Sequence, residues 1–153
     1  MTVPNAVLEG KIMQIPTPDK ILPHRDPFLF LTEVTEYVEG SWAEGYWQLS
    51  GEESFFEGHF PSRPTLPGVL LCEAIAQLGA YLVLADGHFD GKLPLFGGID
   101  KARFRRQVLP GERVDLRVDV RRLSSTAGKA SGSASVDGDI ACTGDLLFVV
   151  VPK

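Results

Sequence analysis

A regular alternation of apolar and polar residues marks the segment Arg113–Leu123 in the second half of the chain. Apolar side chains occupy every second position there, at Val114, Leu116, Val118 and Val120. A period of two is typical of a β-strand with one buried and one solvated face. Three more strand-like segments surround it, at residues 101–108, 129–136 and 140–151. Because turn-forming residues separate these segments, the pattern predicts an antiparallel sheet.

The first half of the chain predicts a short helix, two strands and a loop. Thr17 is a plausible N-cap, and Pro18 occupies the first helical position, where proline is well tolerated. Residues 28–38 are rich in β-branched and aromatic side chains and predict a strand, and residues 41–49 predict its hairpin partner. Residues 51–67 carry several glycines and prolines and predict a loop.

One segment, residues 68–85, is apolar at nearly every position and predicts a helix enclosed on all sides. Thr65 is a possible cap for it, and Pro67 lies where a helix start accepts proline. Glu73 and Gln77 interrupt the apolar run, which makes it a poor membrane span. Since one sheet face cannot cover such a helix, we expect an α+β architecture completed by a second subunit, at least a dimer.

Composition limits the classes of function. The 153 residues, 44% of them hydrophobic, are the size of one domain, so we expect a single domain over residues 1–153. A net charge of −5 argues against binding of nucleic acid. Two cysteines, Cys72 and Cys142, give no disulfide framework, and the N-terminus shows no signal-peptide pattern, so we expect reduced thiols in a cytoplasmic protein.

Several common site motifs are missing from the sequence. No cysteine and histidine cluster has zinc spacing, and there is no P-loop, dinucleotide fingerprint or nucleophile elbow. We therefore expect no metal site. The pair Gly97-Gly98 fits a distorted strand as well as a phosphate cradle.

Glu73 is the first candidate for chemistry, because it is the only charged residue between Arg63 and Asp86. A carboxylate inside an apolar helix is costly unless it is paired or protonated, and burial favours the protonated form. Such groups gather at functional sites. Gln77 follows four residues later on the same helix face and can fix the orientation of Glu73 by a hydrogen bond. The alternative is a structural glutamate whose partner the sequence does not reveal.

The three histidines lie in different settings. His59 is followed by three prolines, at positions 61, 64 and 67, and such a stiff loop can hold a side chain that transfers protons near neutral pH. The alternative is a loop histidine that hydrogen-bonds the backbone. His88 follows the long helix in a polar, glycine-rich stretch, where a cation complements the helix dipole, so we expect no catalysis there. For His24 we expect local hydrogen bonds only.

Residues 58–77, "GHFPSRPTLPGVLLCEAIAQ", closely resemble the signature of the FabZ-type β-hydroxyacyl-(acyl-carrier-protein) dehydratases. Residues 21–31, "ILPHRDPFLFL", and 95–112, "LFGGIDKARFRRQVLPGE", resemble two further blocks of that family in the expected order. The resemblance implies a hot-dog fold, in which an antiparallel sheet wraps a long central helix. It also implies dimers, often assembled as trimers of dimers. Three positions depart from the usual family residues, Asp26, Thr32 and Leu66.

The resemblance further implies a reaction, the removal of water from a (3R)-3-hydroxyacyl thioester to give the trans-2-enoyl thioester in type II fatty acid biosynthesis. The acyl chain would ride on the phosphopantetheine of acyl carrier protein, with no metal or redox cofactor. His59 matches the family's catalytic histidine, which takes a proton from C2, and Glu73 of the partner subunit matches the carboxylate that protonates the departing hydroxyl. The N–H of Gly68 matches the donor to the thioester oxygen. Glutamate rather than aspartate at position 73 favours simple dehydration over dehydration with isomerisation.

A basic stripe is predicted beside this site. Lys101, Arg103 and Arg105 alternate along a predicted strand, with Arg106 next to them. Because acyl carrier proteins are acidic, such a stripe can steer their docking. The alternative is a solvated strand face or an edge protected by charge.

Two other functions would keep the same fold. One is a hot-dog acyl thioesterase, and the other is a non-catalytic subunit that binds acyl carrier protein. The intact set of His59, Gly68 and Glu73 favours the dehydratase over both.

Overall fold

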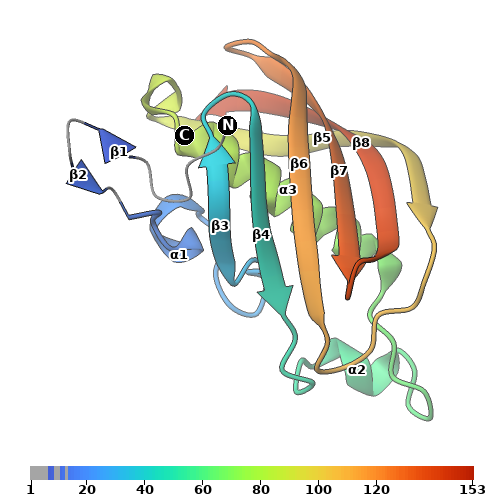
Figure 1. Ribbon diagram of the computed structural model, residues 1–153. Helices are drawn as coiled ribbons and strands as arrows, with labels where there is room; N and C mark the ends of the chain where they lie inside the picture. The colour runs from blue at the N-terminus through green and yellow to red at the C-terminus, as the bar shows by residue number, and fades with distance from the viewer. Residues whose placement is uncertain (1–6, 9–10, 13) are drawn as a thin grey trace.

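The computed structural model describes residues 7–8, 11–12 and 14–153 (Figure 1). The expectation of no signal peptide falls on residues that lie mostly outside this range. The helical elements are α1 (Pro18–Ile21), α2 (Phe55–Gly58), α3 (Gly68–Leu84) and the 3-10 helix η1 (Gly87–Phe89). The strands of the main sheet are β3 (Glu33–Val38), β4 (Trp42–Gln48), β5 (Lys92–Phe104), β6 (Arg113–Leu123), β7 (Ala127–Val136) and β8 (Asp139–Pro152). Two short strands, β1 (Val7–Leu8) and β2 (Lys11–Ile12), pair separately.

The main sheet has six antiparallel strands in the order β3-β4-β6-β7-β8-β5. It curls around α3, which crosses its concave face (Figure 1). The alternating residues of β6 behave as their pattern predicts, since Val114, Leu116 and Val118 are buried while the residues between them are not. This arrangement confirms the α+β, hot-dog architecture.

One chain covers α3 by itself, so the expectation that a second subunit must cover this helix was wrong. All six strands of the curled sheet contact the helix, and its residues from Leu71 to Val83 are buried within one chain except Glu73. The curl of the sheet and the segment before β3 therefore supply the cover that we had assigned to a second subunit. A dimer has to be argued from the site instead.

The strand predicted over residues 28–38 begins only at Glu33. The Phe30 N–H donates to the side-chain oxygen of Gln77, at 2.7 Å, so this backbone group is not available to a strand partner. A contact with the central helix thus overrides the local strand preference of this aromatic segment.

Two predictions around the start of α3 were also wrong. Thr65 does not cap the helix, because Pro67 is the N-cap residue and the Thr65 hydroxyl donates to the Arg63 carbonyl instead. The loop predicted over residues 51–67 contains the single-turn helix α2.

The strand predicted over residues 101–108 is the end of a longer strand, because β5 already begins at Lys92 and ends at Phe104. Its pairing with β8 shifts register between Phe96 and Gly98, which is the strand distortion that Gly97-Gly98 suggested. A second shift occurs between Asp100 and Arg103. Lys101 lies in that shift with a φ of 56°, so the regular alternation expected for the basic residues is broken.

Within the described residues, no helix has the length and apolar character needed to cross a membrane. The same part of the chain holds no cluster of three or more histidine, cysteine or acidic side chains placed to bind a metal ion.

Candidate active site

His59 lies at the end of α2 and points into a cleft of about 510 Å³ at the start of α3. Its Nδ1 is 2.8 Å from the carbonyl oxygen of Thr65. A carbonyl only accepts hydrogen bonds, so Nδ1 carries the proton of the neutral ring and Nε2 keeps a lone pair. The ring also stacks on Phe60, with centroids 4.1 Å apart. The loop therefore holds a histidine whose second nitrogen can act as a base.

Gly68 lines the same cleft and is the first residue of α3. Pro67 precedes it without a side-chain cap. The first N–H groups of a helix have no partner within the helix, and the positive end of the helix dipole lies there. A Cβ at position 68 would lie 2.8 Å from the ring of Phe104, so glycine lets that ring pack against the helix start. The cleft thus places a helix N-terminus beside the base.

Glu73 lines a second, smaller cleft of about 110 Å³, between α3 and the strands β5 and β8. Its Oε1 accepts a hydrogen bond from the side-chain amide of Gln77 at 3.1 Å, which confirms the contact predicted from their spacing. The side chain of Glu73 remains 22% exposed, so one chain encloses it less than expected.

The side-chain amide of Gln77 is hydrogen-bonded through both its oxygen and its nitrogen, and the residue is only 1% exposed. Its oxygen accepts from the N–H of Phe30 at 2.7 Å, and its nitrogen donates to the carbonyl of Phe28 at 3.0 Å. These two backbone contacts fix which end of the amide faces Glu73. Gln77 therefore orients the carboxylate, as the sequence had suggested.

His24 contacts Glu73 as well, which sequence reasoning missed. Its Nε2 lies 3.7 Å from Oε1 of Glu73, and both residues line the smaller cleft. The available signal was that His24 falls in the block of residues 21–31 that resembles the dehydratases. His88, by contrast, lies in η1 after α3, is 91% exposed and pairs with Asp86 at 2.7 Å.

The chain separates the two predicted catalytic side chains. His59 and Gly68 line the larger cleft, while Glu73 lines the smaller one. Glu73 lies five positions after Gly68 on α3, which is about 7.5 Å along the helix axis and roughly 140° around it. One chain therefore offers a base with a helix N-terminus in one place and a carboxylate in another.

Cys72, the residue before Glu73, forms a pair of thiols with Cys142. The sulfur atoms of Cys72 and Cys142 are 3.9 Å apart, and both cysteines are buried and free. Their hydrogen bond lowers the pKa of the Cys72 thiol to about 7 and, with burial, raises the pKa of Cys142. The contact ties α3 to β8.

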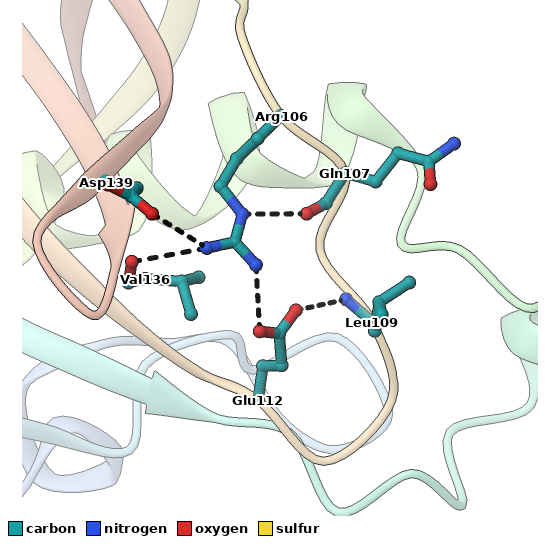
Figure 2. Close-up of polar contacts among 6 residues, drawn as sticks. All are labelled: Arg106, Gln107, Leu109, Glu112, Val136 and Asp139. Carbon is teal, nitrogen blue, oxygen red and sulfur yellow. Dashed lines mark hydrogen bonds and ion pairs between the residues drawn. The ribbon is translucent and has the colours of Figure 1, made fainter.

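The four basic residues of the predicted stripe divide into two groups. Lys101, Arg103 and Arg105 are exposed, and Arg105 lines the larger cleft. Figure 2 shows that Arg106 instead directs its guanidinium towards Glu112, Val136 and Asp139. It donates to Glu112 at 2.9 Å, to the Gln107 carbonyl at 3.0 Å and to the Val136 carbonyl at 3.3 Å.

Arg106 also lies 3.7 Å from Asp139, and the second oxygen of Glu112 accepts from the N–H of Leu109 at 2.7 Å (Figure 2). The guanidinium thus joins the β5–β6 connection to the β7–β8 turn. Only the three exposed residues remain candidates for steering an acidic partner.

Comparison with known proteins gives the family. A family model described as a FabA-like domain matches residues 22–145. The 3-hydroxyacyl-[acyl-carrier-protein] dehydratase FabZ of Clostridium botulinum (strain Langeland) is 46% identical over 140 residues, which are 92% of this chain and 97% of the relative. The enzyme of the same name from Staphylococcus epidermidis is 46% identical over 131 residues, 86% of this chain and 90% of the relative.

Two solved structures share the fold at lower identity. The dehydratase heterocomplex ApeI:P from Xenorhabdus doucetiae has a TM-score of 0.74 at 21% identity and covers 92% of this chain and 94% of its own. A thioesterase from Haemophilus influenzae has a TM-score of 0.57 at 15% identity and covers 78% of each chain. Fold alone therefore does not separate dehydratases from thioesterases, but the sequence identity over nearly whole chains does. The chain belongs to the FabZ-type 3-hydroxyacyl-[acyl-carrier-protein] dehydratases.

Proposed function

We propose that this chain removes water from (3R)-3-hydroxyacyl-acyl-carrier-protein to give the trans-2-enoyl thioester in type II fatty acid biosynthesis, with His59 as base and Glu73 as acid. The observation that carries the proposal is the larger cleft. There the Thr65 carbonyl fixes the proton of His59 on Nδ1, and Nε2 is left as a lone pair beside the start of α3. A base next to a helix N-terminus suits proton abstraction beside a carbonyl.

The reaction follows from these roles. Nε2 of His59 takes a proton from C2, and the electron pair moves towards the thioester oxygen. The N–H of Gly68 and the helix dipole stabilise the negative charge on that oxygen. The electrons then return to form the C2–C3 double bond while the C3–O bond breaks, and Glu73 gives its proton to the departing hydroxyl, which leaves as water. Passage of the C2 proton from His59 to the Glu73 carboxylate restores the starting state, so no metal or redox cofactor enters the proposed chemistry.

The complete site in this proposal contains His59 of one subunit and Glu73 of the partner subunit. The separation of these residues into two clefts of one chain supports it. Large exposed hydrophobic side chains lie at each cleft. Val69 and Phe104 line the larger one, where Phe60 stacks on His59. Leu95 and Phe96 line the smaller one. A two-fold dimer that places the larger cleft of each chain over the smaller cleft of the other would bury both groups. The edge strand β5 is free to pair with its copy in such a dimer. Assembly of three dimers into a hexamer is part of the proposal on the family resemblance alone.

Acyl carrier protein is the proposed partner, docking at Lys101, Arg103 and Arg105. Their exposure and the position of Arg105 at the cleft support this surface. Changing all three to glutamate should lower kcat/KM for the carrier-bound substrate, most strongly at low salt. The same acyl group on a small pantetheine thioester should react as before. Arg122→Glu, a charge reversal at an exposed position of β6, is the matched control. Equal losses with both substrates would contradict the docking assignment.

A cytoplasmic location completes the proposal. It is supported by the two free thiols, since a reducing compartment keeps such thiols unpaired.

The catalytic assignment is tested with purified protein and 3-hydroxyacyl-carrier-protein substrates of several chain lengths, following the near-ultraviolet absorption of the enoyl product. His59→Ala and Glu73→Gln should each lower kcat by about 10²–10⁴-fold while the protein stays folded. His88→Ala should leave kcat unchanged. A folded sample that forms no enoyl product at any chain length would refute dehydration. Release of free thiol would identify a thioesterase, and tight carrier binding without turnover would identify a non-catalytic subunit.

A further inference from the structure

The segment between α1 and β3 is fastened over the face of α3 that carries Glu73 and Gln77. At one end, Nε2 of His24 lies 3.7 Å from Oε1 of Glu73. At the other end, the amide of Gln77 bonds the backbone of Phe28 and Phe30 at 3.0 and 2.7 Å. The segment therefore contacts the carboxylate through His24 and fixes the Gln77 amide that hydrogen-bonds it.

Both contacts fall on the same carboxylate oxygen. Gln77 donates to Oε1 of Glu73 at 3.1 Å, and Nε2 of His24 faces that atom too. Within the part of the chain that the structure describes, no hydrogen bond reaches Oε2. Oε1 is thus the anchored oxygen, and Oε2 is the one available to exchange a proton with a substrate.

The other nitrogen of His24 decides the tautomer of its ring. Among the described residues, Nδ1 of His24 is buried and has no hydrogen-bond partner. A proton on Nδ1 would leave a buried donor unsatisfied and turn the Nε2 lone pair towards Oε1, which is itself an acceptor. A proton on Nε2 is directed at Glu73 and so avoids two facing acceptors, while Nδ1 keeps a buried lone pair.

The burial of Nδ1 favours a fixed ring. No protein group among the described residues bonds Nδ1, so Nε2 is the ring nitrogen that interacts with Glu73.

We propose that His24 is a positioning residue for Glu73. Its Nε2–H and the Gln77 amide hold Oε1, so that Oε2 faces the leaving hydroxyl and the carboxylate left behind meets two N–H groups. The inference rests on the proposed role of Glu73 as acid. A distance of 3.7 Å is longer than a full hydrogen bond, so His24 should contribute less than Gln77.

The other charged groups near this contact are accounted for. Arg25 turns its guanidinium to the carbonyls of Leu22 and His24, at 2.8 and 2.6 Å, and so fixes the backbone of His24 rather than the carboxylate. In the proposed dimer, the partner's cleft would bring His59, Arg105 and Arg106 towards Glu73.

The kinetic test compares His24→Leu with His24→Gln in the full-length protein. The leucine variant removes the donor and should lower kcat about tenfold, with little change in KM. The glutamine variant carries an N–H near the position of Nε2 and should recover most of the activity. The thermal stability of the leucine variant should not fall, because the change also removes a buried, unsatisfied nitrogen. His88→Leu, at an exposed position, is the matched control and should leave kcat unchanged.

A second measurement does not depend on turnover. The side-chain carboxyl of Glu73 is followed by ¹³C NMR as a function of pH and assigned by its loss in Glu73→Gln. Removing a donor from the carboxylate should move the midpoint of this titration upward in His24→Leu and back in His24→Gln.

The two measurements distinguish a failure of the proposed function from a failure of the inference about His24. If the wild-type protein forms no enoyl product but the titration midpoint moves, the proposed function fails and the contact between His24 and Glu73 stands. If the wild-type protein is active and neither kcat nor the midpoint moves, the inference about His24 is wrong by itself. Equal loss of kcat in both variants would also overturn it, because shape and not the donor would then matter.

Discussion

Replacing Gln77 with leucine tests whether the segment before β3 is held by this one side chain. The amide makes three hydrogen bonds, with Phe30, Phe28 and Glu73, and is 1% exposed. Leucine has a similar volume but makes none of these bonds, so the change removes the polar contacts with little change in packing.

The cost depends on which partners water can reach. Phe28 is 50% exposed and the Glu73 side chain 22%, so water can replace the amide at both. Phe30 is only 3% exposed, and its N–H loses its partner without replacement. A buried, unsatisfied donor costs about 1–3 kcal/mol. For a chain of this size, a loss of about 2 kcal/mol lowers Tm by about 4–8 °C.

Gln48→Leu is the matched control. The amide of Gln48 also donates to two carbonyls, those of Leu49 and Gly111, each at 3.0 Å, but its residue is exposed. Its replacement should change the free energy of unfolding by no more than about 0.5 kcal/mol. Both variants are unfolded by denaturant at one fixed protein concentration, since association would stabilise them. If Gln77→Leu is as stable as Gln48→Leu, the segment is held by something other than this amide.

Two further predictions concern other parts of the fold. The hydrogen bond that the His88 ring donates to the Asp86 carboxylate raises the pKa of His88 above 6.5. The stabilisation is therefore fully present below that pH and is lost as pH rises through the folded-state value. His88→Ala should therefore lower Tm at about pH 5 but not at about pH 9, and an equal effect at both would contradict the pairing. Gly132→Ala would place a Cβ against the buried Ile75 side chain and should cost about 1–3 kcal/mol in denaturant unfolding, while Ser133→Ala costs at most about 0.5 kcal/mol. Equal stability of these two variants would show that the core around Ile75 rearranges to accept the added methyl group.

The elements that the sequence predicted well are those whose buried positions follow from a local repeat in the pattern of apolar residues. β6 follows its alternation up to Val118, with Val120 half-buried, and α3 matches the predicted helix to within one residue at its end. The contact of Glu73 with Gln77 belongs to the same class, because residues four apart on a helix always share a face.

The errors have a common physical origin in contacts between distant segments. Residues 28–32 have strand-forming composition, but Gln77, which is 47 residues from Phe30, takes the backbone N–H. Arg106 has the charge of a docking residue, but its partner Val136 comes from a strand 30 residues later. No local pattern distinguishes an arginine that faces solvent from one that holds a turn.

The candidate site depends on distance in a different way. His59, Gly68 and Glu73 lie within 15 residues, yet the family resemblance assigns Glu73 to the partner's half of the site. Helix geometry agrees, because five positions turn the chain by roughly 140° and carry Glu73 away from the end at which Gly68 lies beside His59. The clefts are accordingly lined by different residues of one chain. A motif that is compact in sequence thus lines two separate clefts. In the proposed mechanism, a proton passes from one subunit's acid to a substrate held by the other's base, which requires two copies to meet. Dilution of the protein below its dimer dissociation constant should therefore abolish turnover while each chain keeps both of its clefts.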